Sequence, residues 1–191
     1  MQGGDPVYKD LDGDSTITEA DRTIIGSAQP DYTGGLSGRM AYGRFELSFF
    51  LQFSVGNDIY NINRALLTSA AGNANQLREV ATGGRGIPRP RIGNTFESRP
   101  SDLFVEDGSY LRGKNLRLGY AFPAEWLRAS PLRAMSSLQL YVSVQNFFTV
   151  THYSGYDPEI SEYATTNLAQ GFDFGTYPQP RRITFGIAGA F

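Results

Sequence analysis

The chain has 191 residues, no cysteine and a formal charge of −2, with 22 glycines, 11 tyrosines and 13 phenylalanines. The lack of cysteine excludes disulfides and thiolate metal centres, and the near-zero net charge excludes a global basic field, so no nucleic-acid partner is expected. Glycine and aromatic residues at this level are typical of a β-rich chain with many turns.

Membrane helices are excluded as well. No run approaches the roughly 20 apolar residues that a membrane helix needs, and no signal peptide opens the chain. A membrane β-barrel is still open, because its strands carry only a weak alternating pattern.

The first feature in chain order is the stretch DLDGDSTITEAD, residues 10–21, which has the spacing of a calcium-binding EF-hand loop. It departs from that loop in two places. Ser15 replaces the glycine that makes the sharp turn, and Asp21 replaces the longer glutamate at the end. Calcium, weakly bound, is the predicted cofactor. The predicted metal ligands are Asp10, Asp12, Asp14, Thr16 (through its carbonyl), Thr18 and Asp21.

A second interpretation of this stretch needs no metal. Aspartate side chains also cap neighbouring backbone amides in turns, and Thr18 is suited to be the N-cap of a short helical turn. Both interpretations stay open at the level of sequence.

Five segments alternate apolar and polar residues with period two, which predicts β-strands. A tight turn is expected at Gly43, between the first two strands. The segments are residues 34–43, 44–55, 110–122, 138–147 and 181–191.

The connections between these strands alternate between short and long. Residues 56–108 and 149–180 form long connections, whereas the turn at Gly43 and residues 123–137 are short. Antiparallel neighbours joined in this way have all their long loops at one end, as outer-membrane barrels do. One strand face is aliphatic and aromatic, as for lipid, and the other is polar, as for a wet lumen.

The expected fold is therefore all-β: an antiparallel meander of about five long strands that belongs to a large transmembrane β-barrel with long extracellular loops. A soluble sandwich or a lipocalin-like barrel is the alternative, because the same alternation can face a dry core.

The last segment ends on Phe191, with Phe185 and Ile187 on the same face. A terminal amphipathic strand of this kind resembles the signal by which outer-membrane barrels are recognised for assembly. Phe185, Ile187 and Phe191 are the predicted signal, and the barrel assembly machinery is a predicted partner. A β-domain of any kind can also end on an apolar residue.

Longer motifs carry a more specific resemblance. They are GDPVYKDLDGDSTITEADRTIIGSAQPDYTGG, GNDIYN, VEDGSYLRGKNLRLGYAFP, YVSVQNFFTVTHYSGYDPE and GFDFGTYPQPRRITFGIAGAF. In order and spacing they resemble the C-terminal end of SusC/RagA-type TonB-dependent outer-membrane transporters. Residues 63–100 show no matching motif, as is expected of a variable extracellular loop.

The resemblance implies a fragment of a barrel of about 22 strands that surrounds a plug. Residues 1–32 would be an extracellular loop with the calcium-like motif, and residues 33–191 would be barrel strands and loops. Such transporters are not enzymes. They import oligosaccharides or peptides across the outer membrane of Gram-negative bacteria, with a SusD-type lipoprotein partner, surrounding lipid, and energy from TonB acting through a part missing here.

No catalytic residue is predicted. His152 is the only histidine, so neither a histidine-based triad nor a multi-histidine metal cluster can form. Aromatic residues of the last long loop are candidates either for stacking on substrate or for packing the loop; they are Tyr153, Tyr156, Tyr163, Phe172 and Tyr177. The alternative function is a soluble calcium-dependent carbohydrate-binding or adhesion β-module.

Overall fold

The computed structural model describes residues 7–68, 75, 76, 78, 80, 100–160 and 170–191. The chain forms two compact units, and it alternates between them along its length. The sheet unit comprises Asp31–Val55, Ser109–His152 and Pro178–Phe191. The loop unit comprises Met1–Pro30, Gly56–Gly108 and Tyr153–Tyr177.

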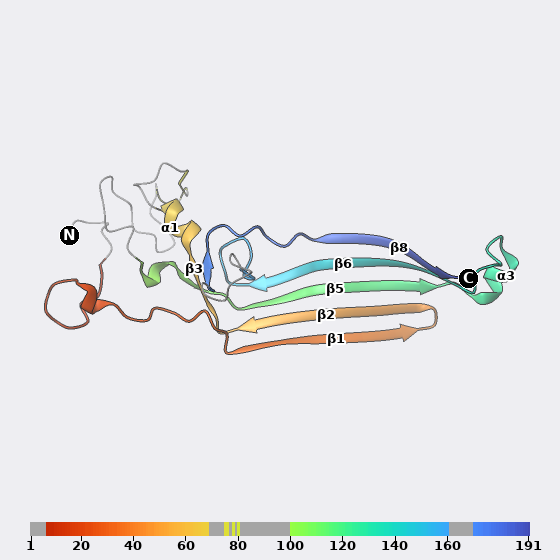
Figure 1. Cartoon of the computed structure of the whole chain (residues 1–191), viewed down its shortest axis with the longest axis horizontal. Helices are drawn as coiled ribbons and strands as arrows, with labels where there is room; N and C mark the ends of the chain where they lie inside the picture. The colour runs from red at the N-terminus through yellow and green to blue at the C-terminus, as the bar shows by residue number, and fades with distance from the viewer. Residues whose placement is uncertain (1–6, 69–74, 77, 79, 81–99, 161–169) are drawn as a thin grey trace. The chain divides into compact units, whose positions relative to one another are not determined.

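Five long antiparallel strands make up the sheet unit (Figure 1). Their order across the sheet is their order along the chain, so the predicted meander is confirmed. The strands are β1 (Tyr32–Tyr42), β2 (Phe45–Val55), β5 (Tyr110–Ala121), β6 (Ser137–Thr151) and β8 (Arg182–Ala190).

The register gives the sheet one apolar face and one polar face. Leu51 of β2 lies opposite Leu36 of β1, and Val142 of β6 lies opposite Leu118 of β5. The apolar face is exposed at β8, where Phe185 is 81% exposed.

The polar face is held together by side-chain contacts between neighbouring strands. Arg39 of β1 forms an ion pair with Glu46 of β2 at 2.8 Å. Arg117 of β5 donates to Gln139 at 3.2 Å, and its guanidinium lies 4.1 Å from the ring centre of Tyr141. Charged and polar side chains therefore link β1 to β2 and β5 to β6 on this face.

A bulge interrupts the alternation in the middle of the sheet. Both neighbours of β5 shift register beside Lys114, and β6 passes through a left-handed residue, Asn146, with φ of 50°. The extra residues let Leu111 and Leu116 share the apolar face although their numbers differ in parity.

Several glycines of the sheet lie beneath aromatic rings from the neighbouring strand. A Cβ atom added at Gly38 would lie 2.5 Å from the Phe49 ring, and one added at Gly34 would lie 2.6 Å from the Phe53 ring. On the polar face, Gly186 lies in the same way against the ring of Tyr141. Between β1 and β2, and between β6 and β8, an aromatic ring therefore occupies the space that a side chain at the glycine would need.

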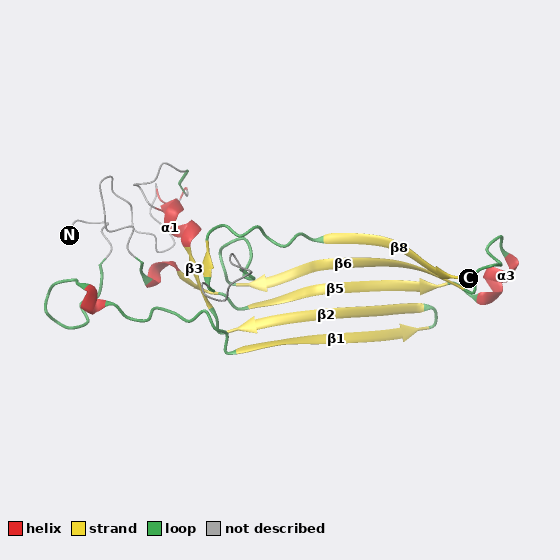
Figure 2. Ribbon diagram, in the orientation of Figure 1, coloured by secondary structure: helices red, strands yellow, loops and turns green. Residues whose placement is uncertain are grey.

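The connections alternate in length, as predicted. The β1–β2 and β5–β6 connections are short and leave the sheet at the same end, which we call the short-turn end, residues 42–45 and 121–137 (Figure 2). Gly43 makes the first turn with φ of 60°, a conformation that glycine adopts without strain. The second contains helix α3 (Ala124–Ala129).

The loop unit has a small sheet of its own, in the order β4-β3-β7. Ile59 and Phe104 are buried in this unit. None of the helices in the described part of the chain is long and apolar enough to cross a membrane. The elements are β3 (Asp58–Asn61), β4 (Val105–Asp107), β7 (Phe172–Asp173), α1 (Ile62–Thr68) and the 3-10 turns Glu19–Asp21 and Asp102–Phe104.

Candidate functional site

The aspartate loop, residues 10–21, folds around its own carboxylates. The amide of Gly13 donates to Asp10 Oδ1 at 2.6 Å, and the amide of Ser15 donates to Asp10 Oδ2 at 2.8 Å. The amide of Thr16 donates to Asp14 Oδ1 at 2.7 Å. The capping role considered for these aspartates is therefore present.

Asp21 closes the loop. Its two carboxylate oxygens accept from the amides of Leu11 and Thr18, each at 2.7 Å. Thr18 caps the turn Glu19–Asp21, and its Oγ1 accepts from the amide of Ala20 at 3.2 Å. The hydrogen bond from Thr18, followed by that from Leu11, lowers the pKa of Asp21, because both stabilise the charged carboxylate.

Three carboxylates of this loop also converge. Oxygens of Asp10, Asp12 and Asp21 lie within 4.8 Å of one another, whereas Asp14 is not part of this group. Ser15 adopts φ of 66°, the left-handed conformation for which EF-hand loops use glycine. The oxygens are hard donors that suit calcium.

Glu106 of β4 is hydrogen-bonded to three other segments of the loop unit, through Asn61, Arg64 and Ser154. Its Oε1 accepts from Asn61 at 3.2 Å, from Arg64 at 3.1 Å and from the Ser154 hydroxyl at 2.9 Å. Its Oε2 accepts from the amide of Ser154 at 2.8 Å. The Glu106 side chain is only 11% exposed, so these donors compensate a carboxylate largely removed from water.

Asp173 of β7 is a second buried carboxylate of the loop unit that accepts several hydrogen bonds. It is 1% exposed and accepts the phenol of Tyr153 at 2.5 Å. The amides of Gly175 and Thr176 donate to its other oxygen at 2.8 and 3.0 Å. Reasoning from sequence did not identify Glu106 or Asp173 as anchors; the available signal was a carboxylate embedded in the motifs VEDGSY and GFDFG.

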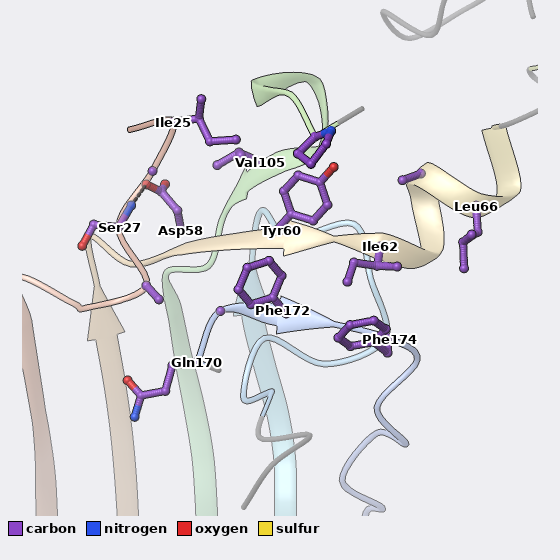
Figure 3. A pocket seen from close by; sticks show the side chains of 15 residues that line it. Ile25, Ser27, Asp58, Tyr60, Ile62, Leu66, Val105, Gln170, Phe172 and Phe174 are labelled. Atoms are coloured by element: carbon purple, nitrogen blue, oxygen red, sulfur yellow. Dashed lines mark hydrogen bonds between the residues drawn. The ribbon is translucent and has the colours of Figure 1, made fainter. Parts of the chain in front are cut away.

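An apolar pocket of about 650 Å³ lies within the loop unit (Figure 3). The ring centres of Tyr60 on β3 and Phe172 on β7 are 5.9 Å apart, and Phe174 lies beyond the end of β7. Asp58 is the charged residue of the pocket lining. Its Oδ2 accepts a hydrogen bond from the amide of Ser27 at 2.9 Å. Burial raises the pKa of Tyr60 above its ordinary value.

The predicted aromatic residues occupy different places. Phe172 lines the pocket and is 44% exposed. Tyr156 and Tyr177 are 76% and 84% exposed, whereas Tyr153 is buried against Asp173. Tyr163 lies outside the described residues.

The short-turn end carries a series of ring contacts. Ring centres are 5.0 Å apart for Phe45 and Tyr120, 5.2 Å for Tyr120 and Phe122, and 4.9 Å for Phe122 and Trp126. Trp126 of α3 is 47% exposed. We call these four residues the aromatic series.

The predicted assembly residues lie at or beyond β8. Phe185 and Ile187 belong to its apolar face and are 81% and 72% exposed, and Phe191 follows the strand at 90% exposure. A role in assembly stays a prediction.

No family model matches the chain. Among curated proteins, TonB-dependent receptor P3 of Formosa agariphila is 37% identical over 196 residues, which covers 96% of this chain and 19% of the receptor. TonB-dependent receptor P26 of the same organism is 30% identical, with 96% and 19% covered. TonB-dependent receptor SusC of Bacteroides thetaiotaomicron is 28% identical, with 98% and 18% covered.

Solved structures agree on the fold. The RagAB peptide transporter matches with a TM-score of 0.72 at 23% identity, covering 93% of this chain and 19% of that one. The RagAB peptide importer in its open-open state matches with a TM-score of 0.70 at 22% identity, covering 96% and 20%. This chain thus spans about a fifth of the length of the relatives that it matches. It is a barrel segment of a SusC/RagA-type TonB-dependent receptor.

Proposed function

We propose that the complete protein is an outer-membrane transporter of a Gram-negative bacterium, which imports oligosaccharides or peptides with energy relayed by TonB and with a SusD-type lipoprotein as partner. The observation that carries this proposal is the sheet unit: five long strands with an open apolar face, a polar face and all short turns at one end. The names of the relatives, among them SusC and the RagAB peptide importer, support it.

The parts of the chain take separate roles in this proposal. The apolar face contacts lipid and the polar face lines the lumen, because charged contacts such as Arg39 to Glu46 need a wet surface. The loop unit lies on the extracellular side, and its exposed aromatic residues Tyr156, Phe172 and Tyr177 contact substrate. Phe185, Ile187 and Phe191 guide assembly.

The alternative of a soluble binding or adhesion module fits the structure less well. A soluble β-domain buries its apolar strand face against a second layer. Here Phe185, Ile187 and Ile183 are each more than half exposed on that face.

Uptake by cells tests the function. The gene is deleted and restored, and accumulation of labelled oligosaccharides and of labelled peptides is measured separately, with the SusD-type partner present or deleted. We expect one substrate class to depend on the gene, on the partner and on TonB. Unchanged uptake of both classes, or recovery of the protein only from soluble fractions, would contradict the proposal.

We also propose that the aspartate loop binds calcium weakly and thereby orders an exposed loop. The convergence of Asp10, Asp12 and Asp21 supports this, and the carbonyl of Thr16 and the side chain of Thr18 are further candidate donors. The hydrogen bonds to the carboxylates of Asp10, Asp14 and Asp21 come from amides within residues 10–21. A peptide of residues 5–27 is therefore a suitable sample. Calorimetry should give saturable binding, and no heat at millimolar calcium would exclude the site.

A further inference from the structure

The short-turn end carries cations that the described part of the chain does not neutralise. Arg44 lies in the β1–β2 turn, Arg128 in α3 and Arg133 in the β5–β6 connection, and all three are exposed. None of them forms an ion pair with a described residue. The acidic side chain among these connections is that of Glu125, so basic charge is in excess.

Other arginines of the sheet are engaged differently. Arg39 is paired with Glu46, and Arg117 lies against Tyr141. Both belong to the polar face. The three arginines of the short-turn end instead lie in the same two connections as Phe45, Phe122 and Trp126 of the aromatic series.

The aromatic series joins these cations to the apolar face. Phe45 and Tyr120 face each other in the register of that face, Arg44 directly precedes Phe45 in the chain, and Trp126 and Arg128 both belong to α3. Tryptophan and tyrosine rings favour the boundary between hydrocarbon and water, and arginine side chains extend from there to charged groups. A surface with this succession of apolar, aromatic and cationic groups complements a lipid with a negatively charged headgroup.

The loop unit has the opposite charge. It contains sixteen aspartate and glutamate residues against eight lysine and arginine residues. The net charge of the loop unit therefore disfavours anionic headgroups, whereas the net charge of the short-turn end favours them.

We propose that the short-turn end binds anionic phospholipid, with Arg44, Arg128 and Arg133 contacting the headgroup phosphates and Trp126 lying at the headgroup level. This inference rests on the proposed function, because it requires the apolar face to contact the membrane. Phospholipid fits better than an acidic protein, because the cations adjoin the exposed apolar face through a series of rings.

The test compares two variants of the complete transporter, each of which loses two exposed arginines. Arg128→Gln/Arg133→Gln changes the short-turn end, and Arg181→Gln/Arg182→Gln changes the opposite end of the same sheet. Each protein is purified in detergent and given equal amounts of phosphatidylglycerol and phosphatidylethanolamine. Native mass spectrometry then measures the ratio of the two bound lipids.

We expect the wild-type protein to favour phosphatidylglycerol. A basic residue near an anionic lipid surface contributes about a five-fold effect, so the short-turn variant should lose about 25-fold of that preference, while the control keeps it. Adding Arg44→Gln should lower the preference further.

Three results would overturn the inference: no preference in the wild type, an equal loss in both variants, or an unchanged lipid ratio with loss of a co-purified acidic protein from the short-turn variant alone. These results differ from failure of the proposed function, which would show as absence of the wild-type protein from the outer membrane.

Discussion

At the scale of single residues, Ser15 is one of two non-glycine residues with a positive φ in the described part of the chain, the other being Asn146. A non-glycine residue in the left-handed region costs about 1–2 kcal/mol, and Ser15 adopts φ of 66° within the aspartate loop. We expect Ser15→Gly to tighten calcium binding roughly five-fold, measured by calorimetry on the peptide of residues 5–27. Ser15→Ala keeps the Cβ atom and is the control. Equal affinities for the two variants would show that binding does not use this conformation.

Tyr153 provides a second prediction at this scale. Its phenol donates to the buried carboxylate of Asp173, and Tyr153→Phe removes that donor. The loss of one partner of a buried carboxylate should destabilise the loop unit by about 1–3 kcal/mol. Faster amide hydrogen exchange around Asp173 would report it. Tyr156→Phe, at a residue 76% exposed, should leave exchange unchanged.

The same pair predicts how the loop unit responds to alkali. Burial first, and then the hydrogen bond to Asp173, raise the pKa of Tyr153 above its ordinary value of 10.0. A raised pKa means that the stabilising contribution is complete below pH 10 and is lost as pH rises through the folded-state value. Protection of the amides near Asp173 should therefore persist at pH 10. Loss of protection well below that pH would contradict the assignment.

At the scale of elements, the two faces of a strand should respond in opposite ways to the same charge. Val142 belongs to the apolar face of β6, and its neighbour Ser143 belongs to the polar face. Arginine at a lipid-facing position near the membrane centre costs about 2–4 kcal/mol, whereas a lumen position tolerates it. We therefore expect Val142→Arg to lower the amount of folded protein in the outer membrane, measured by heat-dependent gel mobility. Ser143→Arg should assemble normally; equal defects would contradict the assignment of faces.

The same elements show what sequence can predict. The five long strands were predictable, because alternation over nine to fifteen residues is a strong local pattern. Strands β3, β4 and β7 span two to four residues, too few to show a period. The spacing of the aspartate loop was visible because its contacts are local. The partners of Glu106 at Asn61 and Ser154 lie 45 and 48 residues away, so no local pattern indicated them.

At the scale of the whole molecule, the five-stranded sheet is open. Strands β1 and β8 each pair with one neighbour in the described part of the chain, so each leaves one edge of backbone donors and acceptors unpaired. Such edges and the apolar face favour association with other chains. Residues 1–191 expressed alone should therefore aggregate in buffer and need detergent, as size-exclusion chromatography with light scattering can show. A soluble monomer would favour the binding-module alternative.

The rings that lie over glycines in neighbouring strands have a consequence for how the sequence can vary. Where Phe49 covers Gly38, a methyl group added at Gly38 would meet the Phe49 ring, so the ring has to move aside or be replaced by a smaller side chain. The two residues are eleven apart along the chain, but a substitution at Gly38 constrains which side chain fits at position 49. Relatives of this protein should therefore exchange such pairs together, and an alanine substitution at Gly38 should be rescued by the smaller Phe49→Leu.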